Sequence, residues 1–174
     1  SVKTKSSSYT GIAFRPGANE IWTGETSRNG PDYILITPVS PLGVPGPGKE
    51  IPLENHAVPS GIAFSAGGEV AYVAMSRSNT LAVFDAATRK LLKEVPVGIA
   101  PFAVAYSKKR HAVYVSNRGG RLPGASETSA PTSGSQALTD PITGTSISGT
   151  VNVIDERTLA SREVVVGRAP SGLA

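Results

Sequence analysis

The sequence contains no cysteine, only two histidines and one tryptophan, and aromatic residues make up 6% of its 174 residues. Without cysteine there can be no disulfide, no thiolate nucleophile, no cysteine-ligated zinc and no iron–sulfur cluster. Long hydrophobic runs are also missing, because the uncharged part of Val95 to Tyr106 is short and contains two prolines. The sequence therefore predicts no membrane span.

The net charge is positive, but the basic residues are scattered along the sequence. Seventeen lysines and arginines against thirteen acidic residues give a formal charge of +4. The only basic run, Lys108 to Arg110, lies in an expected hairpin turn, where such charges are usually solvated. Nucleic acid is therefore not an expected partner.

Glycine and proline are abundant, with 19 and 14 residues, and they indicate frequent turns between short strands. The sequence also repeats itself at a spacing of 42 residues, the distance from Pro59 to Pro101. Three motifs recur: an apolar run near a proline, a run around an aromatic residue, and a run that ends in aspartate. The copies are residues 9–14, 58–64, 100–106 and 169–174, then 20–24, 71–75 and 113–117, then 81–85 and 151–155.

Each repeat unit is interpreted as four antiparallel strands. In the middle unit, short apolar or alternating runs at 61–65, 70–75, 80–85 and 90–97 are separated by turn residues. Four strands in about 42 residues are typical of one blade of a β-propeller. The sequence predicts an all-β propeller segment with blades at 9–58, 59–100 and 101–169 and the start of a fourth at 170–174.

The motifs resemble the YVTN family of bacterial and archaeal β-propeller repeats. The resemblance rests on the prolines before the first strands, on Tyr114–Asn117 and on Val151–Asp155; the first copy departs from it, since 34–38 lacks the aspartate. The third copy, through 116–121 and 140–144, is similar to the loop-bearing blade of secreted bacterial propellers that precede a phosphoesterase domain. This resemblance implies a secreted or periplasmic bacterial protein.

Three blades form only a partial ring, because propellers close with four to eight blades. An open arc exposes two apolar blade faces, which monomers in water avoid. We therefore expect a larger ring of about seven blades, completed by the same longer chain or by another copy.

The third unit carries a long inserted loop at 119–149, about 28 residues beyond the repeat length. It has no aromatic residue and few charges. One interpretation is a mobile surface loop, because loop closure entropy grows slowly with length. The other is a lid or docking arm that stands over the mouth of the propeller channel.

The candidate ligand-binding residues lie on the loops that the fold would gather at this mouth, where a basic funnel could receive an anionic ligand. For His56 the alternative, which the sequence favours, is a loop histidine hydrogen-bonded to backbone or water. The candidates are Arg28, His56, Arg77, Asn117, Arg118, Arg121 and Arg168.

Other conspicuous residues are interpreted as scaffold. Three aspartates each precede a turn, where the carboxylate can accept hydrogen bonds from backbone N–H groups: Asp85, Asp155 and Asp140. For Asp140 the alternative is a calcium site. Trp22, Tyr72 and Tyr114 share one repeat position and are expected to pack between blades. His56 and His111 should lie at opposite ends of the blades and cannot form a metal pair. No cofactor or metal is predicted, and no nucleophile or phosphate-binding motif occurs.

The preferred function is a non-catalytic scaffold or binding module that recognises a protein or an anionic small molecule at the mouth. The alternative is the propeller portion of a larger hydrolase, of phosphoesterase or lactonase type, whose catalytic groups lie mostly outside this chain. A third hypothesis is an electron-transfer role, since some dehydrogenase subunits share this style of repeat.

Overall fold

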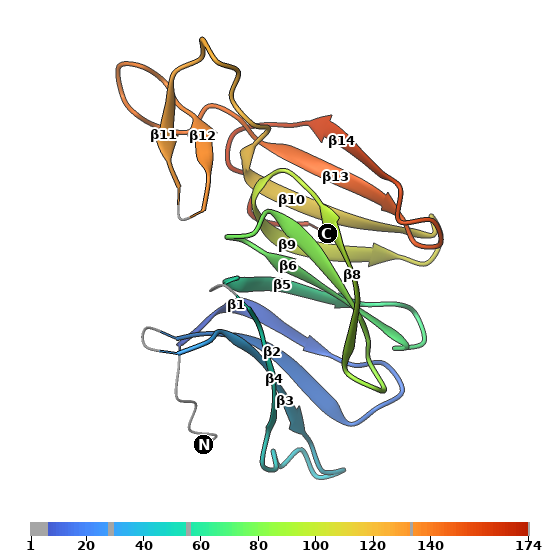
Figure 1. Ribbon diagram of the computed structural model, residues 1–174. Coiled ribbons are helices and arrows are strands. Elements are labelled where there is room, and N and C mark those ends of the chain that lie inside the picture. Colours follow the sequence, from blue (N-terminus) through green and yellow to red (C-terminus); the bar gives the residue numbers. More distant parts are fainter. Residues whose placement is uncertain (1–6, 28–29, 55–56, 133, 174) are drawn as a thin grey trace.

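A computed structural model describes residues 7–27, 30–54, 57–132 and 134–173 (Figure 1). All regular elements in these ranges are strands, and they contain no helix that could cross a membrane. The first sheet is β1 (Ser7–Phe14), β2 (Glu20–Thr26), β3 (Tyr33–Pro38) and β4 (Lys49–Pro52). The second is β5 (Pro59–Phe64), β6 (Val70–Met75), β7 (Thr80–Asp85) and β8 (Lys90–Pro96). The third is β9 (Ile99–Ser107), β10 (Ala112–Gly120), β13 (Thr150–Asp155) and β14 (Ser161–Val165).

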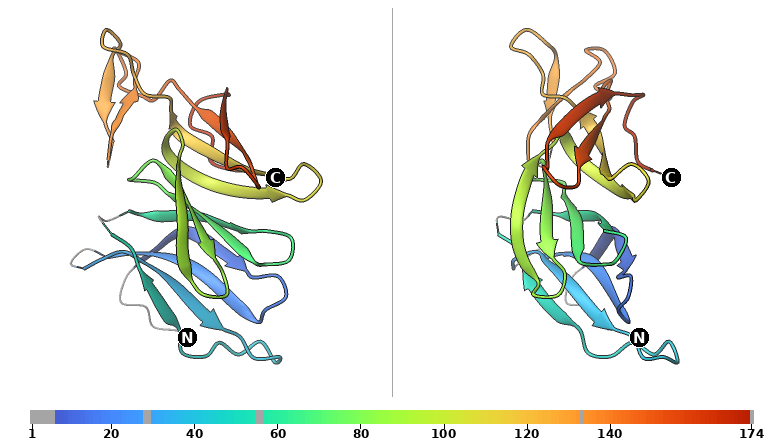
Figure 2. Two further views of the ribbon diagram at one scale, coloured as in Figure 1. Left: turned by 45° about the vertical axis from the view of Figure 1, so that its right-hand side comes forward. Right: turned by 90° about the vertical axis from the view of Figure 1, so that its right-hand side faces the viewer.

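The three sheets are antiparallel meanders that follow one another along the chain. A separate hairpin, β11 (Ser129–Pro131) and β12 (Gln136–Leu138), is inserted between the second and third strands of the last sheet. The sheets are stacked face to face, and β1, β5 and β9 come together as neighbouring first strands (Figures 1 and 2). The all-β arrangement of consecutive four-stranded blades is confirmed.

The core lies between the sheets. One apolar cluster joins the first and second sheets, where Trp22 meets Phe64 and Phe84 edge to face, with ring centroids 5.4 and 6.5 Å apart. A second cluster joins the second and third sheets, where Tyr72 stacks on Tyr106 at 6.2 Å. The predicted packing role of Trp22 and Tyr72 between blades is confirmed. Burial also raises the pKa of Tyr72 to about 12.

The recurring glycine of the first strands is explained by close backbone contact. A Cβ at Gly61 would lie 2.5 Å from the carbonyl oxygen of Phe102 in the next sheet. At the same position in the first repeat, a Cβ at Gly11 would come within 1.6 Å of the Ser60 carbonyl oxygen. Neighbouring first strands can therefore approach backbone to backbone only because these side chains are absent.

Candidate binding site at the channel mouth

The residues directly before the first-strand prolines form three equivalent corners. Val58, Ala100 and Ala169 have φ angles of 53°, 53° and 44°. Left-handed backbone is unusual for residues other than glycine, most of all for a β-branched valine, and persists only where the surroundings hold it. Here the Val58 N–H donates to Asp32 Oδ2 at 2.8 Å, and the Ala100 N–H donates to Asn79 Oδ1 at 3.0 Å. The preceding sheet thus fixes these two corners.

The three corners line one cavity of about 400 Å³. Its lining residues include part of the insert, whose hairpin projects from one end of the sheets (Figure 1). The second and third sheets contribute Ser76, Phe102, Arg118 and Gly119, and the insert contributes Thr132, Ala137 and Ser146. Its lining is mostly apolar, and Arg118 is the only charged side chain among the described residues that line it.

The insert forms a structured wall of this cavity, with a hairpin that the sequence analysis did not predict. Ala137 and Leu138 are buried, and β12 packs against β10. Near the tip, a Cβ at Gly134 would lie 2.1 Å from the backbone oxygen of Arg77, so the hairpin reaches back to the second sheet. The insert therefore contacts two blades.

An ion pair stabilises the stem of the insert. Arg121 donates two hydrogen bonds to Glu127, at 2.7 and 2.6 Å, and the Gly124 N–H donates a third at 2.6 Å. The hydrogen bonds from Arg121, followed by the one from Gly124, lower the pKa of Glu127 to about 2. The guanidinium of Arg121 is thus paired within the insert.

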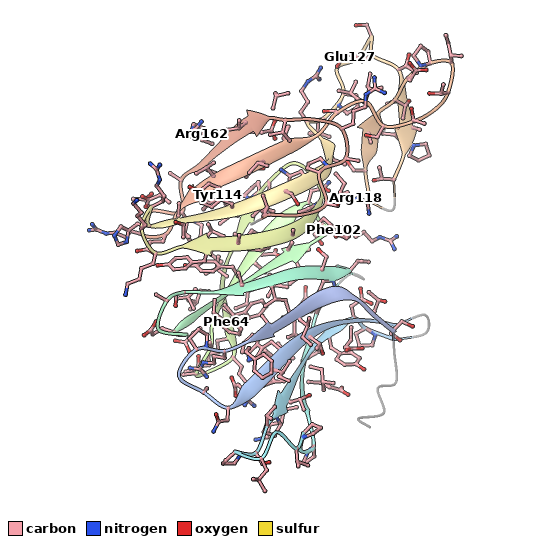
Figure 3. All side chains as sticks on the ribbon, turned by 180° about the vertical axis from the view of Figure 1, so that it is seen from behind. Phe64, Phe102, Tyr114, Arg118, Glu127 and Arg162 are labelled. Atoms are coloured by element: carbon pink, nitrogen blue, oxygen red, sulfur yellow. The ribbon has the colours of Figure 1, made fainter. Side chains whose placement is uncertain are left out.

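The structure separates the other predicted binding residues. Arg118 lines the cavity, and its guanidinium carbon lies 4.9 Å from the centre of the Phe102 ring (Figure 3). Arg77 is exposed beside the hairpin tip. Arg168 lies near the turn of the insert: hydrogen bonds from Thr143 and Ile142 lower the pKa of Asp140, and the charge of Arg168 adds to this effect. Arg28 and His56 lie outside the described residues.

Asn117 is placed inside the third sheet rather than in the cavity lining. Its side chain is fully buried, and its amide donates to Thr150 Oγ1 at 3.0 Å and to Asn152 Oδ1 at 2.7 Å. Its own Oδ1 has no partner among the described residues. These contacts make Asn117 a structural link between β10 and β13.

The turn role predicted for the aspartates is confirmed. Asp85, Asp140 and Asp155 each accept a hydrogen bond from the backbone N–H three residues later, at 2.7, 2.8 and 2.8 Å. No group of three or more potential metal ligands occurs in the described parts of the chain.

Sequence reasoning missed a polar cluster at the opposite end of the third sheet. The Tyr106 hydroxyl donates to Glu156 at 2.5 Å, and His111 Nδ1 lies 2.7 Å from the other oxygen of the same carboxylate. These bonds lower the pKa of Glu156, the one from Tyr106 most. No motif marked this cluster, because Glu156 lies 50 residues from Tyr106 and 45 residues from His111 in the sequence.

It also missed the aromatic wall of the cavity. The repeat position of Phe102 is Ser60 in the second unit and Ser171 in the fourth. A bulky ring where the repeat has a hydroxyl was a visible signal of local specialisation.

No protein-family model matches this sequence, and no curated protein does. Solved structures do resemble it. A luciferin-regenerating enzyme has a TM-score of 0.60 and 13% identity, over 94% of this chain and 48% of that one. The β-propeller domain of Cps50 (Swd1) from Myceliophteria thermophila has a TM-score of 0.54 and 12% identity, over 98% and 62%. Kuenenia stuttgartiensis hydrazine synthase has a TM-score of 0.51 and 16% identity, over 95% and 51%.

These comparisons establish the fold. The neighbours include a β-propeller domain, and this chain consists of stacked four-stranded sheets of the same kind. The chain spans between about half and three-fifths of the length of these structures. Sequence identities of 12 to 16% support a shared fold and do not support a shared function. Membership of the YVTN family stays a prediction.

Proposed function

We propose that this chain is a non-catalytic propeller module that binds a ligand or partner at the channel mouth. The observation that carries the proposal is the cavity of about 400 Å³, which is built from two blades and from an insert that the repeat does not require. Ligand sites are typically concave, largely apolar and equipped with few polar groups, as this one is. From the resemblance to YVTN propellers we further propose that the protein is secreted or periplasmic.

The side chains of the cavity support binding better than catalysis. Among the described residues that line it, Arg118 has no carboxylate or imidazole beside it to act as an acid–base partner. The hydrolase alternative places its catalytic groups mostly outside this chain, and it stays a prediction. No contact in the cavity favours it over the binding module.

The proposal is tested by a ligand screen against a protein whose cavity has been filled. Ligand-observed NMR with a mixed panel of small anions, cations and neutral molecules should find compounds that bind the natural chain. Ala137→Trp should abolish their binding, because the indole would occupy the cavity beside Phe102. Ala87→Trp, on the exposed β7–β8 turn, serves as the matched control and should bind normally.

Because Ala137 is buried, Ser146→Phe is included as a second filling variant at a less buried lining position. Circular dichroism establishes which variants fold. If the compounds bind a folded filling variant as well as they bind the natural chain, or if no compound binds at all, the channel mouth is not a small-molecule site and the proposal is wrong in this form.

A further inference from the structure

At two neighbouring positions beside the cavity, the third repeat unit has different residue types from the second unit. In the second sheet these positions are Ser60 and Ser76, whose hydroxyl oxygens lie 3.0 Å apart. In the third sheet the equivalent positions are Phe102 and Arg118, which are also in contact. Where the second sheet has two small hydroxyl side chains, the third has an arginine positioned over an aromatic ring.

The serine pair has a structural task that the new pair does not take over. Ser60 and Ser76 both donate to the Pro101 carbonyl, at 3.0 and 2.5 Å, and so tie the second sheet to the third. Arg118 makes no ion pair with any described residue, and its guanidinium lies over the ring of Phe102. Its five N–H donors therefore have no scaffold function within the described chain.

The other side-chain donors of the lining are already used. The hydroxyl of Ser76 is bonded to Pro101, that of Thr132 to the Ser135 carbonyl at 3.2 Å, and that of Ser146 to the Ser148 carbonyl at 3.3 Å. The rest of the lining is apolar: Val58, Ala100, Phe102, Ala137 and Ala169. Among the described lining residues, Arg118 is thus the one cationic anchor, and most of the remaining surface is apolar.

We propose that the ligand of this cavity is an organic carboxylate with an apolar body, an inference that rests on the proposed binding function. The carboxylate pairs with Arg118, and the aliphatic or aromatic body lies against the alanines and Phe102. The cation–π contact with Phe102 positions the guanidinium, and its N–H groups, which pair with no described carboxylate, can donate two parallel hydrogen bonds to a ligand carboxylate.

The same lining argues against polyhydroxylated or multiply charged ligands. Their additional polar groups would lose water without gaining hydrogen-bond donors from the side chains, since these are used within the chain. An anion that carries a single charged end avoids this cost. We therefore expect selection by charge at one end and by apolar surface at the other.

Isothermal titration calorimetry with three probes tests this inference. The natural chain should bind 3-phenylpropanoate at least tenfold more tightly than the neutral 3-phenylpropanamide and than the polyhydroxylated gluconate. Arg118→Gln should weaken binding of 3-phenylpropanoate at least tenfold and remove the preference over the amide. Arg110→Gln, which removes an exposed arginine from the opposite end of the third sheet, is the charge-matched control and should bind like the natural chain.

The outcomes separate this inference from the proposed function. If the amide binds as well as the acid, if Arg118→Gln has no effect, or if none of the carboxylates binds, the carboxylate proposal is wrong. In each of these cases the cavity-filling variants still decide whether other compounds bind at the mouth. If 3-phenylpropanoate binds equally to the natural chain and to a folded filling variant, both proposals fail.

Discussion

At the scale of single residues, the hairpin aspartates perform the same task in successive turns. Asp85 accepts bonds from the backbone and the hydroxyl of Thr88, and Asp155 accepts the same pair from Thr158. These bonds favour the ionised carboxylate, because its oxygens only accept hydrogen bonds. They lower the pKa of both groups below the ordinary 3.8.

This gives a prediction for acid stability. Since the pKa is lower in the folded state, the unfolded chain binds more protons near pH 3.8, and the contribution of these aspartates is present above that pH and lost as pH falls through the folded pKa. Thermal unfolding followed by circular dichroism should show a midpoint that declines below about pH 4. The double variant Asp85→Asn and Asp155→Asn keeps an acceptor at each turn and should decline less steeply. Parallel curves would contradict the assignment.

The residue scale also shows what the sequence could predict. The repeat identified Trp22 and Tyr72 as residues between blades, because one bulky position recurred with apolar neighbours. Arg118, Asn117 and Arg121 are candidate binding residues because of their expected place on the loops, and for all three ligand binding stays a prediction. The burial of Asn117 depends on β13, and the pairing of Arg121 depends on how the insert folds. Residue type gives the chemistry of a side chain, and only the fold determines its partner.

At the scale of elements, the insert is joined to its sheet through a narrow neck. Gly120 has a φ of 70°, and a Cβ there would lie 2.0 Å from Ser148 Oγ, so the two ends of the insert are adjacent. Its strands have only three residues each and no aromatic side chain. Short strands without an alternating pattern leave no sequence signal, which is why the hairpin could not be predicted.

Because the two ends of the insert are adjacent, we predict that the insert can be removed while the blades still fold. A variant in which residues 121–147 are replaced by two glycines should keep the β-sheet circular dichroism spectrum and a midpoint of unfolding within about 5 °C of the natural chain. It should lose the ligands of the channel mouth, because Thr132, Ala137 and Ser146 form one wall of the cavity. A protein that does not fold would show that the insert is part of the scaffold.

At the scale of the whole molecule, each end of the stack of sheets carries apolar side chains that the described residues do not fully cover. On the first sheet, Ile12 and Phe14 are 65% and 66% exposed. On the third, Tyr114 occupies the position of the buried Trp22 and Tyr72 but is only partly covered. Further blades, from a longer chain or from a second copy, would cover such faces.

We predict that the isolated 174-residue chain self-associates through these faces. Sedimentation velocity should show dimers or larger species whose fraction rises with concentration, because exposed contiguous apolar surface favours association. The double variant Ile12→Lys and Phe14→Lys should shift the distribution toward monomer. A natural chain that stays monomeric over a hundredfold range of concentration would contradict this prediction.

The position of the core between sheets has a consequence for synthesis on the ribosome. The second sheet shares one apolar cluster with the first and the other with Val113, Val115 and Ile154 of the third. Because Ile154 follows the insert, the second cluster cannot be completed until the ribosome has made the whole of that segment. During this interval the emerging chain holds an unfinished interface, and the length of the insert sets how long it must be protected from wrong partners.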